Sequence, residues 1–264
     1  MSSLQPEESP VVLDSTPRPH TRLLQFNRPQ KRNALSQALI TSLLRHLSSA
    51  DQDPDVHVIV ITGAGSLFSA GADIKEISQL DANEARRTRY LEDLCHGMSR
   101  VRKPLIAAVE SMALGGGFEL ALMCDIIVAS QDARFGFPEV NIGLLPGAGG
   151  TQRLASLVGQ YRAMQMVLTG EPIPASQAKE YGILSSLSEQ GASQHDALDL
   201  AALIAGKSQT AVSLSKEAIK RAVGLGHDLE YERSLYYSAF GTADKEEGIQ
   251  AFLDKRKPVW KQNN

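Results

Sequence analysis

The sequence predicts an α/β fold, and two observations carry this prediction. Short runs of β-branched and aliphatic residues recur along the first two-thirds of the chain, and stretches with helical spacing of apolar residues separate them. Runs such as 58–62 and 105–109 are apolar without alternation, as expected for strands buried on both faces. Strands of this kind alternating with helices predict parallel strand pairing.

The elements are expected in the following order. A helix at 36–49 has apolar residues at helical spacing behind Ser36, a favourable N-cap, and 82–102 repeats this spacing with charges on its other face. From about residue 160 onward helices predominate. We expect strands at residues 11–13, 22–26, 58–62, 105–109, 125–129 and 183–187, and helices at 36–49, 82–102, 175–181, 192–205, 210–223, 229–240 and 245–255.

Length and composition fit one large domain or one domain with an appendage. The chain has 264 residues, of which 42% are hydrophobic and 22% charged, enough to bury a full core. We expect a disordered tail at residues 1–9, an α/β core at 10–200 and a helical region at 201–264. The net charge is −3 with scattered basic residues, which favours neither nucleic acid nor a membrane surface as partner.

The two cysteines, Cys95 and Cys124, do not form a disulfide framework, and no Cys or His cluster has the spacing of metal ligands. We expect both to pack as small hydrophobic residues in a reducing compartment. The first ten residues contain neither an apolar signal core nor an Arg-rich amphipathic helix. This favours a cytoplasmic location, with the mitochondrial matrix as the alternative.

Functional information concentrates in two acidic, glycine-containing segments at residues 114–119 and 135–139. Three consecutive glycines let the backbone approach a ligand, and a helix beginning there would direct free N–H groups toward it. Glu119 and Glu139 each stand in apolar company, where a carboxylate is a candidate acid or base. A third segment, 67–75, follows the expected strand at 58–62.

These segments resemble the enoyl-CoA hydratase/isomerase (crotonase) superfamily. The resemblance extends from about residue 23 to residue 261, and its motifs occur in family order at residues 27–35, 68–76, 113–126 and 138–154. It implies a crotonase-like spiral of ββα units with a C-terminal helical trimerisation region. It also implies a homotrimer or a hexamer made of two trimers, and an acyl-CoA substrate.

The resemblance implies roles for four site residues. The backbone N–H groups of Ala72 and Gly116 would form an oxyanion hole for the thioester carbonyl, and losing one such donor typically costs roughly 3 kcal/mol of barrier. Glu119 would deprotonate a water for attack at Cβ while Glu139 delivers a proton to Cα. Because both acids are present, hydration of a trans-2-enoyl-CoA to a 3-hydroxyacyl-CoA is favoured.

Coenzyme A would be part of the substrate thioester, and no tightly bound cofactor and no metal is expected. Residues 147–151 are expected to begin a helix whose N-terminus faces the acyl pocket. The further contacts with substrate or coenzyme A that the resemblance implies are Lys31, Asn33, Ala34, Ala70, Asp73, Ile74, Lys75, Gly117, Pro138, Gly147, Tyr236, Phe252 and Lys255.

Four residues depart from the usual family pattern, two of them Glu110 and Ser111, which stand where many members have Asn-Gly. Phe118 and Phe137 replace residues that are usually smaller or polar and are expected to narrow or redirect the acyl pocket, and Glu110 is expected to be an added surface acid. Three alternative functions remain open: an enoyl-CoA isomerase, a hydratase for a branched substrate such as methylglutaconyl-CoA, and an RNA-binding or scaffold protein of the same fold.

Overall fold

A six-stranded sheet forms the centre of the computed structural model, which describes residues 9–224 and 229–259. Pairing is parallel from β2 onward, as predicted, but β1 pairs antiparallel with β2 because only two residues connect them. The strands, in spatial order, are β1 (Val12–Arg18), β2 (Thr21–Phe26), β3 (Val58–Gly63), β4 (Leu105–Val109), β6 (Ile126–Ser130) and β9 (Ser186–Ser188).

A second, three-stranded sheet was not expected from the sequence. Its strands are two or three residues long, too short to give a periodic signal. They are β5 (Met112–Leu114), β7 (Arg134–Gly136) and β8 (Ile173–Pro174), of which β5 and β7 pair in parallel and β7 and β8 antiparallel.

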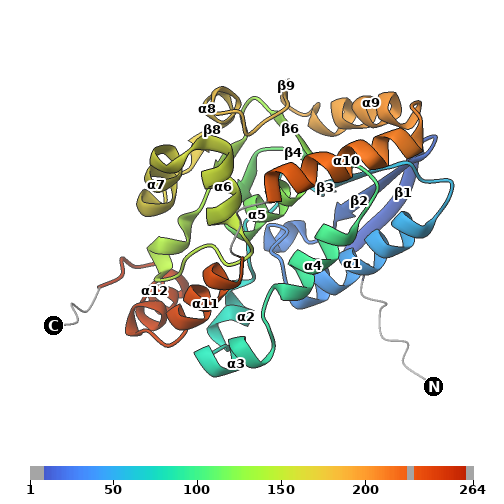
Figure 1. Cartoon of the computed structure of the whole chain (residues 1–264). Helices are drawn as coiled ribbons and strands as arrows, with labels where there is room; N and C mark the ends of the chain where they lie inside the picture. The colour runs from blue at the N-terminus through green and yellow to red at the C-terminus, as the bar shows by residue number, and fades with distance from the viewer. Residues whose placement is uncertain (1–8, 225–228, 260–264) are drawn as a thin grey trace, which may run out of the picture.

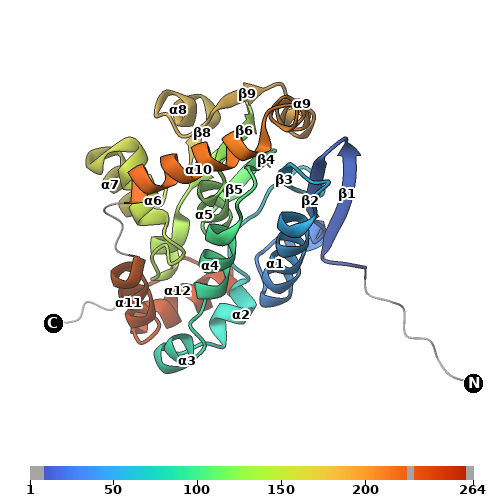
Figure 2. The ribbon, with the colours of Figure 1, turned by 45° about the vertical axis from the view of Figure 1, so that its right-hand side comes forward.

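Alternate residues of the large sheet enter two separate hydrophobic clusters. Val60 and Ile106 belong to a smaller cluster with Ala197 and Ala201 of α9 (Ser193–Ala205), whereas Ile61 belongs to the main core. The main core also contains apolar residues of α1 (Gln37–Gln52), which lies beside β1 and β2 (Figure 2). Helices on both faces explain why the central strands have no polar alternation.

The single helix expected at 82–102 is wrong, because the structure has α3 (Ala82–Arg87) and α4 (Glu92–Arg100) with a turn between them. Arg89 and Leu91 in this turn adopt positive φ angles of 49° and 69°. Tyr90 and Leu91 are both buried. Successive residues of a straight helix point about 100° apart, so the turn lets both enter the core.

Most other expected helices are confirmed within a few residues. The expected strand at 183–187 is shifted, since β9 begins at Ser186, and the last helix ends at Leu253 rather than at residue 255. The remaining helices are η1 (Pro29–Lys31), α2 (Ile74–Ser78), α5 (Gly116–Met123), η2 (Pro138–Ile142), α6 (Gly150–Val158), α7 (Gln160–Thr169), α8 (Ala175–Glu180), α10 (Gln209–Gly224), α11 (Leu229–Ala239) and α12 (Ala243–Leu253).

The C-terminal helices return to the first half of the chain. Helix α11 packs against α3 and α12 against α2, and the four helices gather at one end of the molecule (Figure 1). The boundary expected at residue 200 falls within α9, and Tyr236 and Ile249 belong to the main core. The three-part division stays a prediction, and its tail lies almost wholly outside the described residues. In the described part of the chain, no helix combines the length and apolar character needed to cross a bilayer.

Candidate active site

The segment that follows β3 is held beside the turn between β5 and α5. The N–H of Ser69 donates to the carbonyl of Met112 at 3.2 Å, and the N–H of Leu114 donates to the carbonyl of Ser69 at 3.0 Å. An isolated bridge between Ser69 and Ala113 continues this pairing. The strand-like contact brings two motifs that lie more than forty residues apart in the sequence into register.

This register places the backbone N–H groups of Ala72 and Gly116 next to each other. A Cβ built on Gly116 would lie 3.5 Å from the nitrogen of Ala72, and one built on Gly71 would lie 3.3 Å from the nitrogen of Gly116. Gly71 and Gly115 have φ angles of 99° and 51°, a region that favours glycine. Gly116 begins α5, where N–H groups have no carbonyl one turn earlier.

Glu119 lies one turn into α5 and is only 1% exposed. Its Oε1 accepts the N–H of Ala148 at 2.7 Å and the N–H of Gly150 at 2.8 Å. Gly149 between them is the N-cap of α6 and has a φ angle of 92°. The expected helix start at 147–151 is therefore observed, and its N-terminal N–H groups stabilise negative charge on a buried carboxylate.

Glu139 follows β7 and Pro138 and lies in the first turn of η2. Its Oε1 would be 2.7 Å from a Cβ on Gly115, so any larger residue at 115 would displace the carboxylate or the turn. The first glycine of the triple therefore makes room for Glu139, and the second provides the N–H beside Ala72.

Both carboxylates border one cavity of about 240 Å³. Apolar side chains make up most of its wall, and Tyr236 of α11 and Phe252 of α12 complete it. The lining residues are Leu35, Ala70, Gly71, Ala72, Ile74, Ile77, Leu91, Leu94, Gly115, Gly116, Glu119, Pro138, Glu139, Asn141, Ile142, Leu144, Leu145, Gly147, Ala148, Tyr236 and Phe252.

The cavity therefore includes ten of the residues predicted from the sequence, from Ala70 to Phe252. Sequence reasoning missed most of the apolar wall, including Leu91, Leu94, Leu144 and Leu145. Leu91 and Leu94 are spaced like Ile74 and Ile77, as on one face of a helix, but the same spacing marks ordinary core residues. Only the tertiary structure distinguishes residues of the cavity wall from ordinary core residues.

The other predicted contacts lie outside this cavity. Asn33 is buried and donates to the carbonyls of Ala64 at 3.0 Å and Leu67 at 2.7 Å. Asp73 caps α2 and pairs with Arg28 at 3.2 Å. A Cβ on Gly117 would lie 2.6 Å from the carbonyl oxygen of Ser69, so this glycine permits close packing. Contacts of coenzyme A with these three, and with Lys31, Ala34, Lys75 and Lys255, stay predictions.

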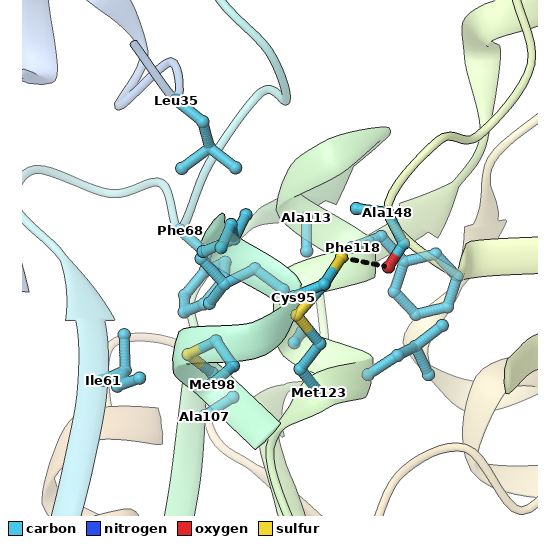
Figure 3. Close-up of a cluster of buried hydrophobic side chains, with 14 of the residues drawn as sticks. Leu35, Ile61, Phe68, Cys95, Met98, Ala107, Ala113, Phe118, Met123 and Ala148 are labelled. Carbon is cyan, nitrogen blue, oxygen red and sulfur yellow. Dashed lines mark hydrogen bonds between the residues drawn. The ribbon is translucent and has the colours of Figure 1, made fainter. Parts of the chain in front are cut away.

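Phe118 and Phe137 do not line the cavity, so the expectation that they narrow an acyl pocket is wrong. Both are completely buried, and their ring centroids are 4.8 Å apart. Phe118 lies in the hydrophobic cluster that also contains Cys95 and Ala148 (Figure 3). A large side chain fits at 118 because successive residues of α5 point in different directions, so Glu119 faces the cavity while Phe118 faces the core.

Glu110 is a helix cap rather than an added surface acid. Its carboxylate accepts the hydroxyl of Ser193 at 2.6 Å and the N–H of Gly191 at 2.9 Å. Ser193 begins α9, which packs on the large sheet. The sequence gives no sign of this contact because 83 positions separate the two residues.

Burial raises the pKa of several cysteine and tyrosine side chains. It raises the pKa of the Cys95 thiol to about 11, and the pKa of Cys124, Tyr90 and Tyr236 also rises chiefly through burial. Both cysteines are free, as predicted, and the Cys95 thiol donates to the carbonyl of Ala148 at 3.6 Å (Figure 3). Among the described residues, no group of His, Cys, Asp and Glu side chains is arranged to hold a metal ion.

Comparisons with known proteins identify the family of the chain. The family model described as "Enoyl-CoA hydratase/isomerase" matches residues 21–263. A probable mitochondrial enoyl-CoA hydratase from Dictyostelium discoideum is 42% identical, with 90% of this chain and 86% of the relative covered. The 2,3-dehydroadipyl-CoA hydratase of Escherichia coli is 44% identical, with 90% of this chain and 94% of the relative covered.

Solved structures show the same fold over nearly the whole chain. A carnitinyl-CoA hydratase from Mycobacterium avium superposes with a TM-score of 0.86 at 35% identity, covering 97% of this chain and 100% of the other. An enoyl-CoA hydratase from Bacillus anthracis gives a TM-score of 0.76 at 35% identity, covering 96% and 100%. The protein has the α/β crotonase fold with C-terminal helices, and it is an enzyme that belongs to the enoyl-CoA hydratase/isomerase family.

Proposed function

We propose that the protein adds water across the double bond of a trans-2-enoyl-CoA to form a 3-hydroxyacyl-CoA. The observation that carries this proposal is that Glu119, Glu139, Ala72 and Gly116 all line one cavity, with the backbone nitrogens of Ala72 and Gly116 close together. Family membership supports an acyl-CoA substrate, in which coenzyme A is part of the thioester. No cofactor enters the reaction.

In the proposed reaction, Glu119 removes a proton from water as the oxygen bonds to Cβ of the enoyl group. Negative charge then develops on the thioester oxygen, where the N–H groups of Ala72 and Gly116 stabilise it. Glu139 donates a proton to Cα, which leaves Glu119 protonated and Glu139 ionised. Transfer of one proton from Glu119 to Glu139 through solvent then restores both groups for the next turnover. The N–H groups of Ala148 and Gly150 favour an ionised Glu119, which suits a base.

The cavity wall favours an uncharged acyl chain. Beyond the two carboxylates, the wall is mainly Leu, Ile, Ala and Gly, and among the described residues no Lys or Arg lines it. A second carboxylate on the acyl chain would therefore be desolvated without a cation, which is costly. This speaks against an acidic substrate such as methylglutaconyl-CoA and leaves straight and branched apolar chains.

The proposal is tested by the loss of enoyl-thioester absorbance with crotonyl-CoA, measured for the wild type, Glu119→Gln and Glu139→Gln. We expect hydration by the wild type and a loss of about 10²–10⁴-fold in each variant, because each removes an acid or base. Isomerisation of a 3-enoyl-CoA without hydration would favour the isomerase alternative. Salt-sensitive RNA binding without any turnover would favour the RNA-binding or scaffold alternative.

We also propose that the enzyme assembles as a homotrimer or as a hexamer of two trimers. Tyr161, Met164 and Leu168 of α7 are 89%, 49% and 68% exposed and are spaced so that they share one helix face. A second copy of the chain would cover this apolar surface.

For the compartment we propose the cytoplasm or the mitochondrial matrix; the named Dictyostelium relative is described as mitochondrial.

A further inference from the structure

The carbonyl of Ala148 occupies a special position beside Glu119. It belongs to the peptide that joins Ala148 to Gly149, which lies between the two peptides whose N–H groups hold the Glu119 carboxylate. Ala148 is completely buried, so its carbonyl requires a donor from the protein. Arg153 supplies one, since its Nη1 donates to this oxygen at 2.6 Å.

The hydrogen bond from Arg153 to this oxygen is stronger than the one from Cys95. A guanidinium donates a charge-assisted hydrogen bond, whereas the Cys95 thiol, whose Sγ is 3.6 Å away, is a weak donor (Figure 3). Peptide units are planar, so fixing one carbonyl fixes the plane of the whole peptide. The Ala148–Gly149 peptide lies between the N–H groups of Ala148 and Gly150. The directions of both N–H groups therefore depend on the orientation of this peptide plane.

The location of Arg153 in its helix is otherwise unfavourable. It lies in the first turn of α6, where its own N–H donates to the carbonyl of Gly149 at 3.0 Å. The N-terminal end of a helix carries partial positive charge and disfavours a cation. The half-buried guanidinium folds back across this turn to the Ala148 carbonyl, and this contact offsets the unfavourable location.

We propose that Arg153 is a positioning residue of the reaction. It holds the Ala148–Gly149 peptide, and through this peptide it holds the two N–H groups that orient the carboxylate of Glu119. The inference rests on the proposed role of Glu119 as the base. Arg153 exchanges no proton and contacts no substrate atom in this role.

The first test compares Arg153→Met, Arg153→Lys and the control Arg22→Met in the full-length protein. Arg22 is also half-buried, but it pairs with Asp14 at 2.9 Å and Asp53 at 3.0 Å, on side chains that do not line the cavity. We expect Arg153→Met to lower kcat for crotonyl-CoA by about 10²-fold with KM changed less than about threefold, because misplaced catalytic groups cost rate rather than binding. Arg153→Lys, which can still donate one hydrogen bond, should recover about tenfold of that loss.

The control should lose stability and keep kcat, which separates positioning from a general loss of folding. A second comparison introduces Arg153→Met into Glu119→Gln, with activity measured at high enzyme concentration. If Arg153 acts through Glu119, the additional loss should fall below about threefold, because residues that act as a unit are not additive. An equal loss of kcat in both backgrounds would overturn the proposal.

Amide hydrogen exchange provides a readout that does not depend on activity. The N–H groups of Ala148 and Gly150 should exchange faster in Arg153→Met than in the wild type and Arg22→Met. Unchanged exchange of these two amides would overturn the positioning role even if the enzyme is an active hydratase. Inactivity of the wild type toward every enoyl-CoA would instead overturn the proposed function, and the exchange rates would still decide whether Arg153 holds this peptide.

Discussion

At the scale of single residues, the site depends on glycine positions where a side chain would collide with neighbouring atoms. A Cβ at Gly150 would lie 2.7 Å from Cζ of Phe137 and 2.8 Å from Oε1 of Glu119. Both distances are below those of real Cβ contacts. The packed Phe137 ring cannot yield easily, so the carboxylate would have to move.

We therefore expect Gly150→Ala to lower kcat by about 10²-fold, since a shift of about 1 Å in a catalytic group is enough for such a loss. Overpacking should also lower the free energy of unfolding by about 1–3 kcal/mol. Gly206→Ala is the matched control, because its Cβ would meet only ordinary contacts at 3.7 Å. Steady-state kinetics of both variants measures the loss of kcat. If Gly150→Ala kept the kcat of the wild type, the position of Glu119 would not limit the rate as we expect.

Residue patterns predicted the acids and the glycines of the site because each motif is local in the sequence. Glu119 lies three residues after Gly116, and Glu139 directly follows Pro138, so no tertiary information was needed to identify them. The contacts of Glu110 with Ser193 and of Arg153 with Ala148 depend on where side chains point in three dimensions. Composition and spacing carry no signal for such contacts.

At the scale of secondary-structure elements, long buried strands and amphipathic helices were predictable and short elements were not. β4 coincides with the expected 105–109, whereas the whole β5–β7–β8 sheet escaped prediction. The break between α3 and α4 escaped it because positive φ angles at Arg89 and Leu91 are imposed by packing rather than by glycine. Tertiary burial of Tyr90 and Leu91 outweighed helix propensity there.

Helix α9 offers a test of a long-range cap. Glu110→Ala should lower the free energy of unfolding by about 0.5–2 kcal/mol, because it removes the carboxylate that accepts N–H and hydroxyl groups at the start of this helix. Activity should not change, since Glu110 does not line the cavity. Urea unfolding measures the effect, with exposed Glu171→Ala as the control. Equal stability of the two variants would contradict a capping role.

The packing of α11 on the turn before α4 predicts a dependence on alkaline pH. Burial raises the pKa of Tyr90 and Tyr236 above the ordinary value of about 10. A raised folded-state pKa contributes stability that is present below the unfolded pKa and lost as pH rises above it. The free energy of unfolding should therefore decline above pH ~10, by at most about 1.4 kcal/mol per pH unit for each tyrosine.

Tyr90→Phe removes the contribution of Tyr90 to this pH dependence. The free energy of unfolding of the variant should therefore decline less steeply above pH ~10 than that of the wild type. The substitution should cost little otherwise, because the buried Tyr90 hydroxyl has no hydrogen-bond partner among the described residues. Burial lowers the pKa of Lys216, which acts in the opposite direction, so the difference in slope between variants is the informative quantity. Parallel declines in the wild type and in Tyr90→Phe would contradict this account.

At the scale of the whole molecule, the α/β fold brings groups from distant parts of the chain around the cavity that contains Glu119 and Glu139. The lining runs from Leu35 to Phe252, so almost the entire chain contributes to the site. The fold class was predictable because the central strands are buried on both faces. The cavity wall was not, because its members are apolar residues like those of any core.

The proposed assembly depends on the exposed apolar face of α7. Leu168→Glu places a charge on the exposed apolar face of α7 and should convert the oligomer to a monomer, because a buried charge in a subunit interface is costly. Sedimentation velocity measures the outcome, with exposed Glu171→Ala as a control that keeps the oligomer. A wild-type protein that is already monomeric would contradict the proposed assembly.

The contribution of Tyr236 and Phe252 to the cavity wall also has a consequence for synthesis of the protein. A chain emerging from the ribosome carries the oxyanion N–H groups and both glutamates long before α11 and α12 exist. Translation at about 5–20 residues per second leaves the apolar trough without its last wall for several seconds. During that interval the nascent protein exposes an apolar surface that chaperones and neighbouring nascent chains can bind. The site is complete only after α11 and α12 have been synthesised and have folded.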